Sequence, residues 1–147
     1  MINGVIIKAL KQIEDDRGKV MHMIKNEMKN PIKFGEIYFS TINPGKVKGW
    51  NYHKMMTLNY ALISGKIKLV LYDDRLKSST SGKIQEIVLS NENYSLVTIP
   101  PQIWISFKCV GEKTAIIANC ADLPHDDNEI ERKSFTDKTI PYDWNKK

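Results

Sequence analysis

The sequence predicts an all-β fold, and three observations support this prediction. Short runs rich in β-branched and aromatic residues recur along the chain, Gly, Pro and Asn punctuate them at regular intervals, and several runs alternate apolar with polar residues. In the run 66–71, Ile67, Leu69 and Leu71 share one face of the strand. Lys66 and Lys68 lie on the other face. This rhythm indicates a β-sandwich or a small barrel.

Each expected strand ends at a turn signal. The polar segment 14–18 follows the first strand, Asn-Pro-Gly at 43–45 follows the second, and Ser-Gly at 64–65 and Asp-Asp-Arg at 73–75 follow later ones. A serine-rich loop covers residues 77–82. The expected strands are residues 4–10, 33–41, 47–53, 57–63, 66–72, 84–89, 95–99, 103–110 and 114–120.

Two segments leave their structure open. Residues 20–28 mix charged and apolar positions, and they fit either a strand continuing from Gly18 or a short helix. Residues 130–135 are too short and too charged to assign. From Leu123 onward the chain contains Pro124, Pro141 and many charges, so we expect a tail that wraps the outside of the fold.

Length and composition indicate one domain over residues 1–147. A chain of 147 residues with 41% hydrophobic residues is long enough to build its own core. No stretch approaches the roughly 18 apolar residues of a membrane span, and the N-terminal segment lacks the apolar centre of a signal peptide. We therefore expect a cytoplasmic protein without a membrane partner, in which Cys109 and Cys120 are reduced core residues rather than a disulfide.

The charge balance favours a small anionic ligand over nucleic acid. The net charge is +5, but the 22 basic residues are spread along the whole chain without an aromatic-interleaved basic run. A solvated, lysine-rich surface explains this pattern. A modest positive field also suits a nucleotide diphosphate.

Short motifs occur in an order that resembles one known family. They are Asp16-Arg17-Gly18, Phe34–Ser40, Lys48-Gly49-Trp50-Asn51-Tyr52-His53, Asp73-Asp74-Arg75, Ser78–Thr80, Leu89-Ser90, Asn93, Ile99-Pro100, Glu129 and Ile140–Trp144. In this order they resemble the D-x-R-G, R-G-L-H, D-x-R, S-P-T, I-P and I-x-W markers of the dTDP-4-dehydrorhamnose 3,5-epimerase family, from Gly4 to Trp144. The resemblance implies a double-stranded β-helix of the cupin or jelly-roll type.

The same resemblance implies an activity. Family members epimerise a nucleotide-linked 4-keto-6-deoxy sugar with a histidine base, an aspartate that orients it and a tyrosine, and they require no metal or redox cofactor. The matching positions depart from this set. Asn51 stands at the base histidine, Ala118 at the tyrosine and Ile105 at a second histidine, and the chain ends before the segment that carries the aspartate. Asn51 cannot serve as a base, because its amide does not titrate near neutral pH.

Two other residues are candidates for the missing acid and base. His53 lies two residues beyond Asn51, so on a strand both side chains face the same way, and imidazole has a suitable pKa. The alternative is that His53 only hydrogen-bonds within the pocket wall. Tyr38 and Tyr60 are candidate proton donors, of which Tyr38 is preferred, and each of them also fits a core or wall position.

Ligand-binding residues follow from the resemblance as well. Arg17 and Lys48 correspond to family arginines that grip the phosphates or the sugar, and Glu36 shares a face with Tyr38 in the segment that matches a substrate-contacting strand. Asn51 and Tyr60 complete the predicted binding set. With His53 as the one histidine of this segment we expect no metal site. Asp73 and Arg75 are expected to close a strand end.

The sequence thus predicts a nucleotide-sugar isomerase of the 3,5-epimerase type with an altered acid and base set, acting on a dTDP-linked sugar. The alternative is a non-catalytic cupin that binds a nucleotide sugar or glycan, or supports a partner enzyme of polysaccharide synthesis. A 3,4-ketoisomerase is a third possibility, with the same histidines missing. The run Ala115–Ala118 is apolar on both faces, and we expect a homodimer.

Overall fold

The computed structural model describes residues 1–27 and 32–146, and these residues form strands and loops without a helix. The strands are β1 (Ile6–Ala9), β2 (Gln12–Asp15), β3 (Gly18–Met21), β4 (Glu36–Ile42), β5 (Val47–His53), β6 (Leu58–Ser64), β7 (Lys66–Asp73), β8 (Ile84–Ser90), β9 (Ser95–Ile99), β10 (Ile103–Cys109), β11 (Ala115–Ala121) and β12 (Ile130–Arg132). None of these residues belongs to a helix of the length and apolarity that a bilayer span requires.

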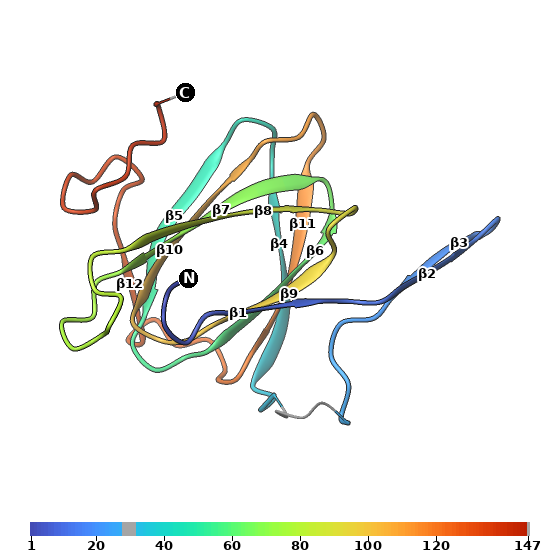
Figure 1. The fold of residues 1–147 in the computed structure, drawn as a ribbon, viewed down its shortest axis with the longest axis horizontal. Helices are drawn as coiled ribbons and strands as arrows, with labels where there is room; N and C mark the ends of the chain where they lie inside the picture. Colours follow the sequence, from blue (N-terminus) through green and yellow to red (C-terminus); the bar gives the residue numbers. More distant parts are fainter. Residues whose placement is uncertain (28–31, 147) are drawn as a thin grey trace.

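Ten of the strands form two five-stranded sheets that face each other (Figure 1). One sheet has the order β1-β9-β6-β11-β4, the other β12-β5-β10-β7-β8, and every pair of neighbours is antiparallel. From β4 to β7 the chain passes from one sheet to the other at each step, as in a jelly roll. The predicted all-β jelly-roll fold is confirmed, and the two sheets stay separate rather than closing into one barrel.

The main core lies between the two sheets. The alternation predicted for β7 places Ile67, Leu69 and Leu71 in this core, each without exposed surface, while Lys66 is exposed. Strand β10 contributes Ile105 and Phe107 to the same core. Since two sheets bury each other's inner faces, any polar side chain on these faces marks a place where packing is interrupted.

A second, aromatic core covers the outer face of the β5-β10-β7 region. Trp50, Trp104 and Trp144 are buried there together with Val70 and Ile140. Ile140 and Trp144 come from the C-terminal segment, which runs along the outside of this sheet in Figure 1. The predicted wrapping tail is therefore present, and it packs against the outer face of β5.

The N-terminal region adds one strand, β2, to those expected. The polar turn predicted within residues 14–18 is present at Asp16 and Arg17, and it joins β2 and β3 into a hairpin that projects from the sheets (Figure 1). Of the two possibilities for residues 20–28, β3 takes the strand as far as Met21, and Met28 lies outside the described residues. Both faces of the hairpin are largely exposed, so its charged sequence shows no clear alternation of buried and exposed residues.

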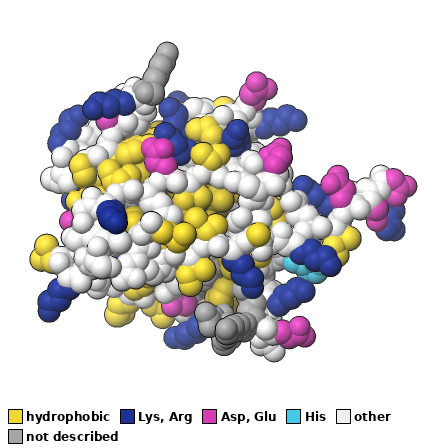
Figure 2. Space-filling view, viewed as in Figure 1, with side chains coloured by type: hydrophobic (Ala, Val, Ile, Leu, Met, Phe, Trp, Pro, Cys, Tyr) yellow, Lys and Arg dark blue, Asp and Glu magenta, His cyan; other side chains and the backbone are white. Residues whose placement is uncertain are grey.

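The surface agrees with the interpretation of the charge pattern. On the face in Figure 2, hydrophobic side chains gather near the middle, and lysine and arginine side chains are scattered over the face and its rim rather than collected in one patch. Cys109 and Cys120 are both buried free thiols, as predicted.

Candidate active site

A local irregularity in β5 turns its polar side chains toward the inside. Lys48 is paired across the strands with Phe107, and Asn51 with Ile105. Both partners on β10 face the core, so Lys48 and Asn51 also lie on the inner face. Even spacing would not place positions 48 and 51 on one face. The register shifts between them, and Gly49 sits there with φ +115°, where an added Cβ would come within 2.6 Å of the Ile105 carbonyl oxygen. The bulge therefore depends on glycine.

The inner faces leave a cavity of about 190 Å³ near this bulge. Four residues predicted for the site, Tyr38, Lys48, Asn51 and Tyr60, line it together. They come from both sheets, since Tyr38 lies on β4 and Lys48 on β5. The remaining lining residues are Ser40, Phe107, Ile117 and Asn119.

His53 lies one step farther along the same face of β5 and forms a buried pair. Its Nδ1 is 2.8 Å from Oε2 of Glu129, and the residues are each 6% exposed. The other carboxylate oxygen of Glu129 accepts the backbone N–H groups of Met55 and Met56 at 2.9 and 2.8 Å. Both oxygens are thus occupied, and the carboxylate is rigidly held. This pairing fixes the orientation of the imidazole ring.

The environment keeps Glu129 charged. Burial by itself raises the pKa of this carboxyl, but the N–H of Met55, the His53 ring and the N–H of Met56 together lower it below its ordinary value. A carboxylate facing Nδ1 favours the tautomer with hydrogen on Nδ1. Nε2 is then the basic nitrogen of His53.

The two predicted tyrosines differ in their surroundings. Burial raises the pKa of Tyr60 far above its ordinary range, and its ring packs edge-on against Phe107 with centroids 6.4 Å apart. Tyr60 is therefore a wall residue. Burial also raises the pKa of Tyr38, and the charges of Glu36 and Glu129 add to this, while contact with Asn119 lowers it.

Lys48 supplies a positive charge at the cavity. Its Nζ is 3.2 Å from the hydroxyl of Ser40 on β4, so this contact bridges the two sheets at the cavity. The side chain is exposed, which leaves the ammonium free to meet an anion from solvent. The role of Lys48 in ligand binding stays a prediction.

The structure does not bring Arg17 or Glu36 to the cavity. Arg17 lies at the tip of the β2–β3 hairpin, where its guanidinium pairs with the neighbouring Asp15 at 2.7 Å. Glu36 shares the inner-facing side of β4 with Tyr38, but its carboxylate accepts the backbone N–H of His125 at 2.8 Å. The partner of Arg17 is local, two residues away in the same hairpin, whereas the partner of Glu36 depends on the path of the loop that carries His125.

Asn119 is a cavity residue that the sequence analysis missed. On β11, Ala115, Ile117 and Ala121 face the core, and Asn119 follows the same alternation. Ala118, the position matched to the family tyrosine, pairs with Phe39 and faces the opposite side. A lone amide in an otherwise apolar inward pattern was the available signal.

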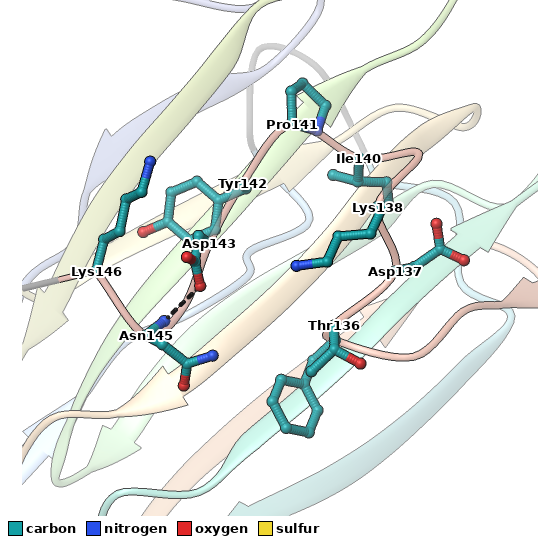
Figure 3. Close-up of a pocket in the computed structure, with 10 residues that line it drawn as sticks. Thr136, Asp137, Lys138, Ile140, Pro141, Tyr142, Asp143, Asn145 and Lys146 are labelled. Carbon is teal, nitrogen blue, oxygen red and sulfur yellow. Dashed lines mark hydrogen bonds between the residues drawn. The ribbon is translucent and has the colours of Figure 1, made fainter.

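The larger hollow in the C-terminal tail offers weaker chemistry. It measures about 380 Å³ and is lined only by residues between Phe135 and Lys146 (Figure 3). Asp143 faces it and accepts the backbone N–H of Asn145 at 2.9 Å. Most of its side chains are exposed, and it lies outside the sheets. We therefore take the inner cavity as the candidate site.

Nothing in the described ranges groups three or more side chains of the metal-binding kinds. His53 and Glu129 supply two such groups, and they are satisfied by each other. The pair lies one strand step beyond Asn51, and neither of its residues lines the cavity.

Comparison with known proteins places this chain in a family. A family model described as dTDP-4-dehydrorhamnose 3,5-epimerase matches residues 1–147. The crystal structure of a dTDP sugar isomerase from Desulfovibrio desulfuricans superposes with a TM-score of 0.95 at 41% identity, covering 97% of this chain and 92% of that one.

Two relatives with assigned roles are similar over nearly their whole length. The spore coat polysaccharide biosynthesis protein SpsL of Bacillus subtilis is 27% identical, with 99% of this chain and 97% of the relative covered. The probable low-salt glycan biosynthesis epimerase Agl13 of Haloferax volcanii is 29% identical, with 98% and 95% covered. The predicted family and the prediction of a carbohydrate epimerase or isomerase are confirmed. The chain belongs to the dTDP-4-dehydrorhamnose 3,5-epimerase family of sugar-nucleotide isomerases.

Proposed function

We propose that this protein isomerises a dTDP-linked 4-keto-6-deoxy sugar by moving a proton next to the ketone, with His53 as the base and Tyr38 as the proton donor. The observation that carries the proposal is the buried His53–Glu129 pair, which lies on the same strand face as the cavity residue Asn51. The backbone N–H groups of Met55 and Met56 fix the carboxylate, and this gives the imidazole the fixed orientation that a base requires.

The base step uses Nε2 of His53. It takes a proton from a carbon next to the ketone, the C–H electron pair forms the double bond of an enolate, and the negative charge moves to the ketone oxygen. Glu129 stabilises the imidazolium that results, as in other histidine–carboxylate pairs. Consecutive same-face residues of a strand lie about 7 Å apart, so a sugar beside Asn51 is within reach of His53.

The acid step uses the opposite wall. Tyr38 is on β4 and His53 is on β5, which belong to the two facing sheets. A proton returned from the Tyr38 hydroxyl therefore reaches the sugar from the side opposite the base, which inverts the carbon. The phenolate then regains a proton from solvent, and the imidazolium loses one. No net oxidation occurs, so the chemistry needs no redox cofactor.

The ligand follows from the cavity's size and charge. At about 190 Å³ it is smaller than the roughly 300 Å³ at the lower end of common ligand pockets, so it takes the sugar rather than a whole nucleotide. The diphosphate then lies outside, where the Lys48 ammonium is exposed. Among the structural neighbours, the Legionella pneumophila epimerase was solved with dTDP-4-keto-L-rhamnose, at a TM-score of 0.84 and 22% identity.

We also propose a homodimer that acts in the cytoplasm as a single domain per chain. Ile37 and Phe39 on β4 are 54% and 66% exposed, and Ile13 and Val20 on the hairpin are 48% and 58% exposed. Burying such residues against a second copy removes apolar surface from water. Arg17 can then serve only the site of the other copy, because its hairpin projects away from its own sheets. The two free thiols fit a reducing compartment.

The test is deuterium incorporation in heavy water, followed by NMR, with dTDP-4-keto-6-deoxyglucose as the substrate. The native protein should introduce deuterium next to the ketone, and His53→Gln should lower the rate at least a hundredfold. The matched control is His125→Gln, since His125 also pairs with an acid, Asp127, but is exposed. The control should keep the native rate.

Each other outcome has a definite meaning. Equal rates for the native protein and His53→Gln would remove His53 from the chemistry. If the native protein binds the nucleotide sugar in calorimetry without any exchange, it is a binding module. If it neither binds nor exchanges, this substrate class is wrong.

A further inference from the structure

Asn119 lies between the two tyrosines of the cavity. Strand β11 is flanked by β6 on one side and β4 on the other, and Asn119 pairs with Tyr60 on β6 and with Tyr38 on β4. All three side chains line the cavity. Asn119 is only 1% exposed, so its amide has to find its partners within the protein or in a ligand.

The orientation of this amide is fixed from the β6 side. Its Oδ1 accepts the backbone N–H of Asn59 at 3.0 Å. Asn59 is itself held, because its side chain donates to the Cys120 carbonyl at 2.9 Å and accepts the Thr98 hydroxyl at 2.7 Å. A backbone N–H can only donate, so the Asn119 oxygen has to face β6. Its Nδ2 then faces β4.

The Nδ2 group has no acceptor within normal hydrogen-bond geometry among residues 1–27 and 32–146. The polar group beside it on β4 is the hydroxyl of Tyr38, and this contact lowers the pKa of the phenol against the effect of burial. The other charged or titratable groups around Tyr38 are Glu36 and Glu129, which raise its pKa, and Tyr60 and Lys48 along the cavity.

We propose that Asn119 is the positioning residue of Tyr38: its amide N–H faces the phenol oxygen and so turns the hydroxyl hydrogen into the cavity. This inference rests on the proposed function, since it explains how Tyr38 is set up to deliver a proton. An oxygen that meets a donor on the β4–β11 side has its own hydrogen free for the ligand. Without the amide, the hydroxyl can turn toward other acceptors.

The first test needs no substrate. Tyrosine labelled with ¹³C at Cζ allows the titration of Tyr38 to be followed by NMR in the ligand-free protein, and Tyr38→Phe assigns the signal. Asn119→Ser deletes the amide without adding a charge. Asn119→Asp keeps the acceptor for Asn59 but replaces the donor by an acceptor. Both changes should raise the pKa of Tyr38, and the exposed control Asn3→Asp should not. An unchanged titration in both variants overturns the inference.

The second test measures two rates with dTDP-4-keto-6-deoxyglucose in heavy water. Exchange at the carbon next to the ketone reports the base, and formation of the inverted sugar reports the acid. Asn119→Ser and Asn119→Asp should lower the ratio of inversion to exchange at least tenfold, with exchange itself within threefold of native. In a Tyr38→Phe background, the Asn119 changes should have less than a twofold further effect.

The two tests separate the inference from the function on which it rests. Native exchange with a ratio that Asn119 substitutions leave unchanged overturns the role of Asn119 and keeps the proposed function. If the effects of the Asn119 substitutions and of Tyr38→Phe simply add, Asn119 does not act through Tyr38 and is only a packing residue. If the native protein shows no exchange, the proposed function fails, and the ligand-free titration still decides whether Asn119 controls Tyr38. Because Asn119→Ser and Asn119→Asp are both measured, a loss of folding in one of them still leaves the other to decide the result.

Discussion

His53 Nδ1 and Glu129 Oε2 lie 2.8 Å apart, although their residues are separated by 76 positions in the sequence. The pair is closed off from solvent on both sides, whereas the other histidine–carboxylate pair, His125 with Asp127, is largely exposed. A buried carboxylate that loses its partner is costly, so the two residues depend on each other.

Replacing Glu129 by Gln should remove the base. The Gln oxygen stays with the backbone N–H groups of Met55 and Met56, so its NH2 group faces Nδ1 of His53 and the ring hydrogen moves to Nε2. We expect the deuterium exchange rate to fall by a factor on the order of 10⁴, the loss typical of a histidine held in the wrong tautomer. Asp127→Asn is the matched control and should keep the native rate. A loss in both variants would point to a general effect on folding.

Stability should fall in acid because of Asp73. Burial raises the pKa of this carboxyl, but hydrogen bonds from Arg75, Ser78 and Thr80 together hold it far below its ordinary value of 3.8. A lowered pKa contributes stability that is present above pH 3.8 and is lost as the pH falls below it. Urea unfolding at pH 7 and pH 3 measures this loss.

Asp73→Asn should flatten this acid dependence and cost about 3–5 kcal/mol at pH 7, because it leaves Arg75 without its charged partner. Glu112→Gln at an exposed position should retain the native profile. An unchanged slope in Asp73→Asn would assign the acid sensitivity to another carboxyl, with Glu129 the next to test.

Lys48 should contribute to binding of the diphosphate. Charge-assisted hydrogen bonds are worth about 1.5–3 kcal/mol, and an exposed lysine is expected at the low end, so Lys48→Ala should weaken dTDP binding about tenfold. Calorimetry at two salt concentrations measures the effect, which should shrink at high salt. Lys46→Ala, an exposed lysine two residues away, should bind like the native protein.

Phe39→Glu should separate the proposed dimer. Phe39 is 66% exposed on the outward face of the edge strand β4, and a carboxylate there cannot be buried against a second copy without a partner. Sedimentation equilibrium should report a monomer for this variant. Leu76→Glu, at a residue that is 94% exposed, should stay dimeric. A native protein that already sediments as a monomer would rule out the dimer.

Trp144→Ala should lower stability while leaving the cavity in place. Trp144 is 6% exposed and packs against Trp50 with ring centroids 6.5 Å apart, so the loss should approach the 3–5 kcal/mol typical of a buried aromatic residue. Urea unfolding measures it, and Phe135→Ala, at a residue that is 39% exposed, is the control. Deuterium exchange per folded molecule should be unchanged.

Local pattern predicted most strands, because each one carries its own signal of alternation and turns. The expected segment 47–53 coincides with β5, and 95–99 coincides with β9. The hairpin of β2 and β3 was missed because neither strand is buried on either face. A strand without a buried face leaves no apolar period to detect.

The site could be predicted only in part, for a different reason. The shared face of Asn51 and His53 follows from spacing along one strand. The pairing of His53 with Glu129 does not follow from spacing, because Glu129 reaches His53 only where the later part of the chain comes back to the edge of β5. The place of Lys48 on the inner face depends on the register shift at Gly49, which no alternation rule reveals. Asn119 becomes meaningful only when β11 is seen between β4 and β6.

The two faces of strand β5 have different roles. Asn51 lines the cavity and His53 forms its buried pair on the inner side, while Trp50 and Tyr52 anchor the aromatic layer under the tail. A substitution at an inward position can therefore alter the chemistry while the outer layer still holds the strand in place. Asn51 is such an inward position, and the buried Trp50 beside it holds the strand independently of the side chain at position 51.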